Sequence, residues 1–411
     1  MLQLVVHRST RQIGGNCVEL SVGGDRIVLD CGRPLDAAAD AIGLLPPTLD
    51  VHRACHGVLI SHPHQDHYGL LQELPPDWPV YSGAATQALM RLTAGIFGTS
   101  PVRDYRAWAN DQPLQLGPFR ITPWLTDHSA FDAYMLLIEA AGRRVLYSGD
   151  FRIHGRKAAL VRQMIGHPPE NLDVLLLEGT NLGGNKTTTS EALLERQFET
   201  LFRETPGRVF VCWSAQNIDR TVTLYRACLR TQRTLVVDLY TAEVLELLAA
   251  AGRIPQAGWR NLKIVITRAF ARIYEAKGRG DFVHRMAQQG ISARQLTVSP
   301  ERWVIMTRPS LIGDMRRKGV RPTSDDAWSY SQWSGYLEKP DGIRLRRWFE
   351  EGGARARHIH TSGHASGTDL RAFAAAMRPK TLVPIHGAAW DTDAAGFANV
   401  RRLEDGELLS I

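Results

Sequence analysis

The chain has 411 residues, of which 44% are hydrophobic, and it carries a net charge of +7. This length predicts two domains, and no apolar run reaches the roughly 18 residues that a membrane helix needs. The five cysteines form no Cys-x-x-Cys pair, which argues against a cysteine zinc site and fits a reducing compartment. Residues 1–8 have no charged leader before their apolar stretch, so we expect a first strand there and a cytoplasmic protein.

The first third of the chain predicts strands separated by glycine turns. Residues 17–22 alternate like a half-buried strand, and residues 26–30 form a second strand that ends on Asp30. The apolar run 58–60 then leads directly into Ser61-His62-Pro63-His64-Gln65-Asp66-His67. A buried strand that ends in such a polar loop delivers its side chains to the rim of a sheet.

Four residues of this loop are potential metal ligands. His62 and His64 are two residues apart, so both imidazoles can reach one cation, and Asp66 and His67 are placed for a second. Imidazole nitrogen and carboxylate oxygen are ligands that Zn(II) prefers. A lone histidine is most often structural, but four ligands in this order predict a metal site.

Three later segments supply further candidate ligands, each at the end of an apolar stretch. His128 would complete a trio with His62 and His64, and Asp150 ends a strand from which a carboxylate can bridge two cations. His386 follows another short strand and offers a last imidazole. Each of these three alone is more often structural, but strand ends are where loops build sites.

From about Asn181 the pattern changes to alternating strands and helices. The capping-box spacing of Thr188 and Glu191, with apolar residues at 194, 198 and 201, predicts a helix. Short buried strands are predicted at 209–213, 234–238, 263–267 and 303–307. This alternation predicts a parallel sheet covered by helices, inserted before the site residues that return from His358 onward.

The positive charge is concentrated in this middle section. Residues 181–357 carry 29 Lys/Arg against 18 Asp/Glu, or +11, whereas the rest carries 20 against 24, or −4. A basic lobe attracts polyanions, although a solvated arginine-rich surface is the alternative. Trp328, Tyr330, Trp333 and Tyr336 could stack bases there, or form the edge of a packed core.

The candidate ligands together resemble a known family. Asp30, the loop from His62 to His67, His128 and Asp150 resemble the metallo-β-lactamase fold. Three further segments are similar to the extra motifs of the β-CASP nucleases, which include ribonuclease J-like and mRNA 3′-end processing factor-like proteins: Glu178-Gly179-Thr180-Asn181, His360-Thr361-Ser362-Gly363-His364-Ala365-Ser366 and Pro384-Ile385-His386-Gly387. The resemblance implies an α/β protein: an αββα sandwich of residues 1–180 and 358–411, with an inserted α/β β-CASP domain at 181–357.

The resemblance also implies roles for individual residues. One zinc would be held by His62, His64 and His128, and the other by Asp66, His67 and His386. Asp150 would bridge the two, and Asp30 would fix the orientation of a ligand. Manganese is the alternative metal.

The implied reaction is hydrolysis of RNA phosphodiester bonds by a zinc-dependent ribonuclease, as an exonuclease, an endonuclease or both. Two cations would activate a hydroxide beside Asp66. Glu178 would orient His364, and His364 would protonate the leaving oxygen as a general acid. Ser362 and Ser366 flank His364 and would bind a phosphate, although an ordinary turn is equally consistent.

The sequence departs from the family pattern in three places. Gly179 stands where a serine is frequent, and Thr307-Arg308-Pro309-Ser310 stands where ribonuclease J tends to have a glycine-rich turn. The sequence ends about 25 residues after His386, so we expect the further C-terminal domain of ribonuclease J to be missing. These departures leave the set of candidate metal ligands intact, but they leave open which substrate the protein acts on.

Single-stranded RNA is the expected partner, with DNA possible, no membrane, and a possible homo-oligomer. A DNA nuclease on the same scaffold is one alternative, and a non-catalytic RNA-binding subunit is another. A small-ester or lactam hydrolase is disfavoured by the 177-residue basic insertion from 181 to 357 and by the His364 motif.

Overall fold

The computed structural model describes residues 1–38, 40–98, 103–184 and 188–411. It divides into two compact units, one made of Met1–Thr188 with Gly363–Ile411, the other of Thr189–Ser362. The second unit is thus inserted into the first, and the domain boundaries at 180/181 and 357/358 stay predictions. Among the helices that the structure describes, none is long and apolar enough to span a bilayer.

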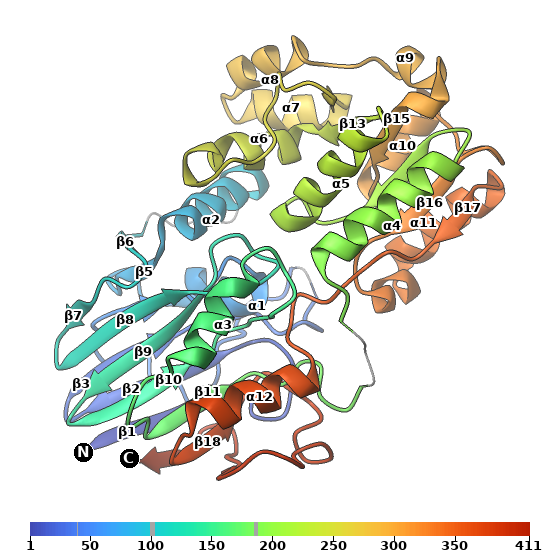
Figure 1. Cartoon of the computed structure of the whole chain (residues 1–411). Helices are drawn as coiled ribbons and strands as arrows, with labels where there is room; N and C mark the ends of the chain where they lie inside the picture. Colours follow the sequence, from blue (N-terminus) through green and yellow to red (C-terminus); the bar gives the residue numbers. More distant parts are fainter. Residues whose placement is uncertain (39, 99–102, 185–187) are drawn as a thin grey trace. The chain divides into compact units, whose positions relative to one another are not determined.

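The first unit contains a seven-stranded sheet in the order β19-β1-β2-β3-β4-β5-β6 (Figure 1). The strands from β3 to β6 are parallel, whereas β19, β1, β2 and β3 pair antiparallel. Their bounds are β1 (Leu2–Arg8), β2 (Cys17–Val22), β3 (Asp25–Leu29), β4 (Val58–Leu59), β5 (Val80–Gly83), β6 (Tyr105–Trp108) and β19 (Leu408–Ser410).

A six-stranded sheet in the order β18-β11-β10-β9-β8-β7 faces it. Because β10, β11 and β18 are parallel neighbours, the residues that follow them meet at one edge of the sheet. The bounds are β7 (Leu114–Leu116), β8 (Phe119–Leu125), β9 (Tyr134–Ala140), β10 (Arg143–Tyr147), β11 (Val174–Leu177) and β18 (Thr381–Pro384).

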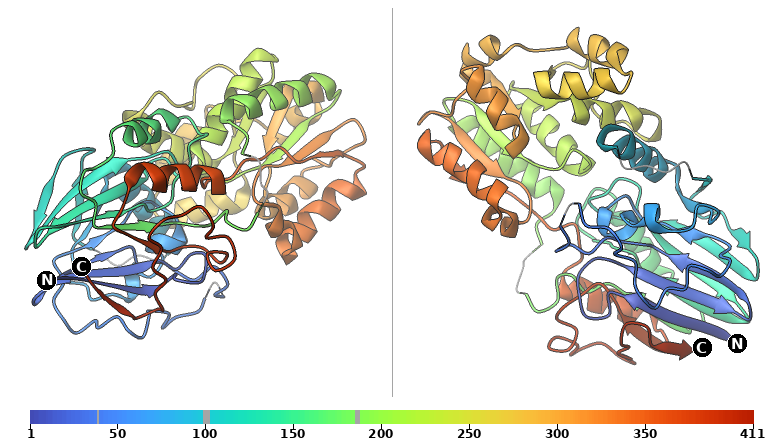
Figure 2. Two further views of the ribbon diagram at one scale, coloured as in Figure 1. Left: turned by 60° about the horizontal axis from the view of Figure 1, so that its bottom comes forward. Right: turned by 180° about the vertical axis from the view of Figure 1, so that it is seen from behind.

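Apolar side chains of both sheets pack into one core between them, as with Leu29 of β3 and Leu136 of β9. The outer face of the second sheet is covered by α3 (Ala158–Gly166) and α12 (Gly367–Met377), which Figure 2 shows lying across the strands. The outer face of the first sheet packs against a cluster that includes Leu70, Leu71 and Met90, from the segment holding α1 (Gln65–Tyr68), η1 (Leu71–Glu73) and α2 (Ala84–Phe97). This arrangement confirms the predicted αββα sandwich.

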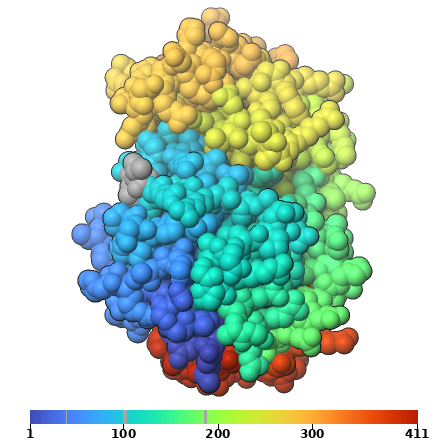
Figure 3. Space-filling model, turned by 90° about the vertical axis from the view of Figure 1, so that its left-hand side faces the viewer, coloured from blue at the N-terminus to red at the C-terminus, as the bar shows by residue number. Residues whose placement is uncertain are grey.

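The two ends of the chain lie side by side in this unit. Gln3 of β1 pairs with Ser410 of β19, and Figures 2 and 3 show the first and last segments in contact. The segment after residue 363 therefore adds one strand to each sheet: β19 beside β1, and β18 beside β11.

The second unit is a six-stranded parallel sheet in the order β14-β13-β15-β12-β16-β17, which confirms the predicted parallel sheet with helices. Its strands are β12 (Val209–Cys212), β13 (Thr234–Asp238), β14 (Leu262–Val265), β15 (Trp303–Met306), β16 (Ala327–Tyr330) and β17 (Arg355–Arg357). Its helices are α4 (Glu191–Glu204), α5 (Ile218–Arg230), α6 (Leu239–Leu247), η2 (Ala249–Ala251), α7 (Arg268–Ala276), α8 (Gly280–Ala287), α9 (Ala293–Thr297), η3 (Pro300–Arg302), α10 (Pro309–Arg317), η4 (Ser334–Glu338) and α11 (Pro340–Glu351).

The first helix of this unit corrects one sequence prediction. The side chain of Ser190 accepts a hydrogen bond from the amide of Leu193, so Ser190 is the N-cap of α4. The predicted cap at Thr188 is wrong by two residues, because the adjacent hydroxyl amino acids offer the same signal and the local backbone selects among them.

Candidate metal centre

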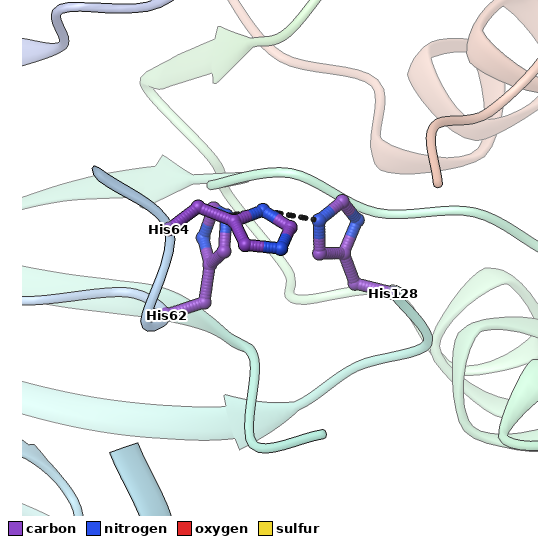
Figure 4. A group of neighbouring side chains, drawn as sticks. All are labelled: His62, His64 and His128. Carbon is purple, nitrogen blue, oxygen red and sulfur yellow. Dashed lines mark hydrogen bonds between the residues drawn. The ribbon is translucent and has the colours of Figure 1, made fainter. Parts of the chain in front are cut away.

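Three histidine rings meet beyond the ends of β4 and β8 (Figure 4). His62 and His64 lie on the loop after β4, and His128 follows β8. Nδ1 of His64 lies 3.1 Å from Nε2 of His62 and 3.3 Å from Nε2 of His128. The structure thus brings the three predicted ligands of the first metal together as one group.

The hydrogen bonds around His62 show which of its nitrogens faces the group. Ser61 donates its hydroxyl to Asp30 at 2.8 Å, so its oxygen accepts from Nδ1 of His62 at 3.0 Å. The lone pair of that ring is therefore on Nε2, which points at His64. Nδ1 of His64 carries at most one N–H, which can be donated to Nε2 of His62 or to Nε2 of His128 but not to both. At least one of these Nε2 lone pairs is therefore left without a proton facing it.

Burial keeps these rings neutral. It lowers the pKa of His64 to about 4, and it lowers the pKa values of His62 and His128 well below the ordinary range. Neutral imidazoles whose nitrogens converge in a buried place have the donor set that a divalent cation requires. The residues present therefore fit a metal.

The second group consists of Asp66, His67, Asp150 and His386. Asp66 and His67 lie on α1, whereas Asp150 and His386 follow β10 and β18 at the shared sheet edge. Nε2 of His67 lies 3.0 Å from Asp150, and Nε2 of His386 lies 3.3 Å from Asp66. These are the four residues predicted for the second metal and the bridge.

Glycine at position 32 is required for this placement of α1. A Cβ atom on Gly32 would lie 1.6 Å from the carbonyl oxygen of Asp66. The amide of Cys31 donates to the carbonyl of His67 at 2.7 Å, which fixes the helix against the end of β3. Backbone packing of this closeness leaves no room for a side chain.

Hydrogen bonds also turn the lone pairs of His67 and His386 toward the carboxylates. Nδ1 of His67 donates to Asp30 at 2.7 Å, and Nδ1 of His386 donates to the hydroxyl of Thr180 at 2.8 Å. Each Nε2 lone pair then faces a carboxylate oxygen, which is repulsive unless a positive charge lies between them. Oδ1 of Asp150 is buried and has no hydrogen-bond partner among the described residues.

The electrostatics of His67 agree with this reading. Burial lowers its pKa, but the carboxylates of Asp150 and Asp30 outweigh burial and raise that pKa well above its ordinary value. The site thus favours a positive charge between His67 and Asp150, which a divalent cation supplies.

Asp30 contacts His67 of the second group, while its role in orienting a metal ligand stays a prediction. Its carboxylate accepts hydrogen bonds from the amide of Ser61 at 2.7 Å and from the phenol of Tyr147 at 2.6 Å, besides those from His67 and the Ser61 hydroxyl. Asp30 and His386 both adopt a left-handed φ, of 56° and 48°. Such backbone strain in buried residues other than glycine is concentrated at functional sites.

Sequence reasoning missed Ser61, Tyr147 and Thr180 as partners of the ligands. Ser61 directly precedes His62, where a hydroxyl next to a histidine is a usable signal, whereas Thr180 has no histidine beside it in the sequence. Tyr147 ends β10, where the only signal is a hydroxyl-bearing ring in an apolar strand. The contacts of Tyr147 with Asp30 and of Thr180 with His386 join residues far apart in the chain, so no local pattern predicts them.

His364 lies beside the second group and is held by Glu178. Nδ1 of His364 lies 3.0 and 3.2 Å from the two carboxylate oxygens, and Glu178 also accepts from the amide of Phe151 at 3.0 Å. Burial lowers the pKa of His364, but Glu178 and Asp150 outweigh it and raise the pKa to about 9. These carboxylates thus favour the protonated form of the imidazole, and 20% of its side chain is exposed.

The two serines that flank His364 have different places. Ser366 is the N-cap of α12, where its hydroxyl accepts from the amide of Asp369 at 3.1 Å. Ser362 is the last residue of the second compact unit. Ser366 therefore has a structural task, and phosphate binding by either serine stays a prediction.

The packing around Gly179 accounts for its departure from the family pattern. A Cβ atom at this position would lie 2.1 Å from Nε1 of Trp390, which is fully buried and donates to the carbonyl of Ile385. A serine would overlap the indole. Gly179 and Trp390 thus form a matched pair beside His386.

Comparisons with known proteins agree with this geometry. Residues 25–211 match the beta-lactamase superfamily domain, and residues 353–395 match the Zn-dependent metallo-hydrolase RNA specificity domain. Ribonuclease J of Helicobacter pylori (strain ATCC 700392 / 26695) is 25% identical over 405 residues, which cover 92% of this chain and 54% of that protein. Ribonuclease J of Mycobacterium tuberculosis (strain H37Rv) is 24% identical, with 92% and 67% covered.

The chain therefore spans about half the length of the Helicobacter relative. A crystal structure of a protein of unknown function from Enterococcus faecalis V583 matches over 99% of both chains, with a TM-score of 0.77 and 18% identity, which shows the fold. The metallo-hydrolase match and the two clusters of histidine and aspartate together indicate a metal-binding site.

Proposed function

The chain is a metallo-β-lactamase-fold protein of the β-CASP, ribonuclease J-like type, and from this premise we propose that it is a zinc-dependent ribonuclease. One observation supports this most. His364, held by Glu178, lies beside two groups of candidate metal ligands. A general acid next to a pair of cation sites is what hydrolysis of a phosphodiester requires.

We infer that His62, His64 and His128 would hold one zinc ion, that Asp66, His67 and His386 would hold the other, and that Asp150 would bridge them. Two such cations, when bound, supply Lewis acidity to the scissile phosphate and to the attacking water. Asp30 and Thr180 keep the ligand rings in place through Nδ1 of His67 and of His386. Manganese is the alternative metal at these donors.

The residues of the chain move the protons. The carboxylate of Asp66, with 15% of its side chain exposed, accepts a hydrogen bond from the attacking water. Because Glu178 occupies Nδ1 of His364, the proton on Nε2 is the one donated to the leaving 3′ oxygen. The raised pKa of His364 supplies the acid form of this group at neutral pH.

We propose single-stranded RNA as the substrate. The matched RNA specificity domain includes His364 and His386, and the section between residues 181 and 357 carries a net charge of +11. The same scaffold could hold DNA, so the DNA nuclease remains the second candidate to test. Retention of the whole candidate ligand set favours catalysis over a non-catalytic RNA-binding subunit. Exonuclease or endonuclease mode, a cytoplasmic location and a homo-oligomer stay predictions.

The experiment is digestion of one RNA sequence prepared with a 5′ monophosphate, with a 5′ hydroxyl, and as its DNA counterpart. The protein is supplied with zinc or manganese, and the product lengths are read over time. We expect RNA cleavage that a chelator abolishes, and a loss of about 100-fold or more in His364→Ala with its metal content unchanged. Intact RNA with metal-loaded protein, or full activity in His364→Ala, would overturn the proposal.

A further inference from the structure

A cavity of about 320 Å³ opens at the carboxyl edge of the parallel sheet in the second unit. Cys212 and Tyr330 end two adjacent strands, β12 and β16, and Arg308 follows β15 on the other side of β12. Gln332, Tyr336 and Lys339 complete this part of the lining. Open parallel sheets bind ligands at this edge, beyond the carboxyl ends of the strands.

Two helices begin at the cavity. Arg308 is the N-cap of α10 and Lys339 is the N-cap of α11, and both line the cavity. The amides of a helix start and a cation beside them attract an anion. Asp238 and Thr241 hold Nη2 of Arg308 at 2.9 and 3.2 Å, so its guanidinium is fixed in place.

The free positive charge comes from Lys339. Lys339 is exposed, and it forms no ion pair within the described part of the chain. Asp341, the acidic residue of the lining, pairs with Arg344 at 3.1 Å. The carboxylates of Asp238 and Asp341 are thus each paired with an arginine. The ammonium group of Lys339 is therefore available to bind a phosphate.

Two exposed aromatic side chains lie beside the cavity and are called the rim here: Tyr336 is part of the lining, and Trp333 contacts Tyr336 from outside the lining. Trp333 is 51% exposed and Tyr336 is 46% exposed, and their ring centroids are 5.2 Å apart in an edge-to-face arrangement. A Cβ atom on Gly342 would lie 2.2 Å from the carbonyl oxygen of Tyr336, so the turn that carries Tyr336 packs tightly on the start of α11. The backbone that carries Tyr336 is therefore held by this packing.

The other two aromatic residues of this segment belong to the core. Trp328 and Tyr330 are buried, and the ring of Trp328 stacks on Phe349 at 4.7 Å. Of the four aromatics predicted to stack bases or to pack, the structure therefore leaves Trp333 and Tyr336 in contact with solvent. Large aromatic rings exposed together beside a cavity mark a binding surface.

We propose that this rim and cavity form a subsite for single-stranded RNA, in which Trp333 and Tyr336 stack on bases and Lys339 binds an adjoining phosphate. The volume is that of a small-ligand pocket, which suits one nucleotide. Stacking accepts any base and needs no base-specific hydrogen bond. The inference rests on RNA as the substrate and adds a place on the second unit where the strand is held.

Binding is measured by fluorescence anisotropy of a labelled single-stranded RNA with the metal-loaded His364→Ala protein, which binds without turnover. Adding Trp333→Ala is expected to weaken binding about 10-fold, and Trp333→Phe less, because a smaller ring still stacks. Trp259→Ala is the matched control: Trp259 is 36% exposed on the same unit and contacts Tyr225, which does not line the cavity, whereas Trp333 contacts the lining residue Tyr336. Far-ultraviolet circular dichroism checks that each variant folds.

An oligomer of the same length that lacks bases separates stacking from charge. The parent and Trp333→Ala should bind this oligomer equally, whereas Lys339→Gln should weaken both oligomers and lower the salt dependence by about one phosphate contact. Equal RNA affinity of Trp333→Ala and the parent would overturn the subsite. So would a nucleoside monophosphate that saturates the cavity without displacing RNA, since it would make the cavity a site for a free nucleotide.

The two proposals fail in different ways. If the unmodified protein cleaves RNA while Trp333→Ala binds like its parent, the subsite is wrong and the ribonuclease stands. If RNA binds with the stated dependence on Trp333 but is never cleaved, the subsite stands and the ribonuclease is wrong.

Discussion

The carboxylate of Glu178 accepts a hydrogen bond from Nδ1 of His364 at 3.0 Å, and this contact decides which ring nitrogen is left for a substrate. Glu178 follows β11, and His364 precedes α12, which packs on the same sheet. Asn181 donates to the carbonyls of His364 and Ala365, which holds the backbone of this segment as well. The imidazole is thus fixed from its ring and from its main chain.

Glu178→Gln should lower RNA cleavage by about 10- to 100-fold, because a neutral amide orients His364 less firmly. The carboxylate also raises the pKa of His364, so the acid form is present below about 9 and is lost as the pH rises through that value. Without the carboxylate this pKa falls, and the alkaline limb of the pH–rate profile should move to lower pH. Metal content should stay constant, and a parallel loss of metal would instead make Glu178 a ligand.

Asp150→Asn should lose most of its bound metal, because Oδ2 of Asp150 lies between the two groups, 3.7 Å from Nε2 of His62 and 3.0 Å from Nε2 of His67. Metal per chain is measured after dialysis, together with the shift in melting temperature on adding zinc. Asp173→Asn is the matched control. Asp173 is a buried carboxylate that directly precedes β11, at the edge of the sheet opposite Asp150, and it pairs with Lys380 and Arg143. Full metal occupancy in Asp150→Asn would refute the bridge.

Thr180→Val keeps the shape of the side chain and removes the acceptor for Nδ1 of His386. Affinity for one of the two metals should fall about 10- to 100-fold, which a titration with a competing chelator would resolve. Thr126→Val is the control, because the buried hydroxyl of Thr126 has no hydrogen-bond partner among the described residues. Equal metal retention by both variants would show that the Thr180 contact does not tune the site.

Gly179→Ser should destabilise the protein by about 1–3 kcal/mol, because the new side chain overlaps the buried indole of Trp390. Urea unfolding measures this cost. Trp390→Phe removes the overlapping nitrogen, so the double variant should be less destabilised than the sum of the single ones. Strict additivity would mean that the backbone at Gly179 moves away from the ring instead.

Much of the fold could be predicted because strand ends and ligand types are local features. The loop from Ser61 to His67 predicts the end of a buried strand and a metal site within seven residues. Because His364 and His386 follow only after a long segment of different pattern, the sequence also predicts an insertion. The structure brings the predicted ligands into two groups, while their role as ligands stays a prediction. The inserted parallel sheet followed from the regular alternation of apolar strands and helices.

The remainder depends on contacts between distant segments. The hydroxyl of Tyr147 reaches Asp30 across 117 positions, and Thr180 reaches His386 across 206, so neither pairing has a local sequence signal. The same holds for Trp390, whose position explains Gly179. The split of the aromatic segment into two buried and two exposed rings depends on tertiary packing, which spacing alone does not reveal.

The order in which the first unit is assembled has a consequence for synthesis on the ribosome. His386 and β18 come from the segment that returns after the inserted unit, and β18 is the neighbour of β11 at the edge where Asp150 lies. A growing chain therefore exposes its basic section before it can complete the second group of candidate ligands. The proposed RNA cleavage requires this group, so it cannot begin before the codons for this last segment have been translated.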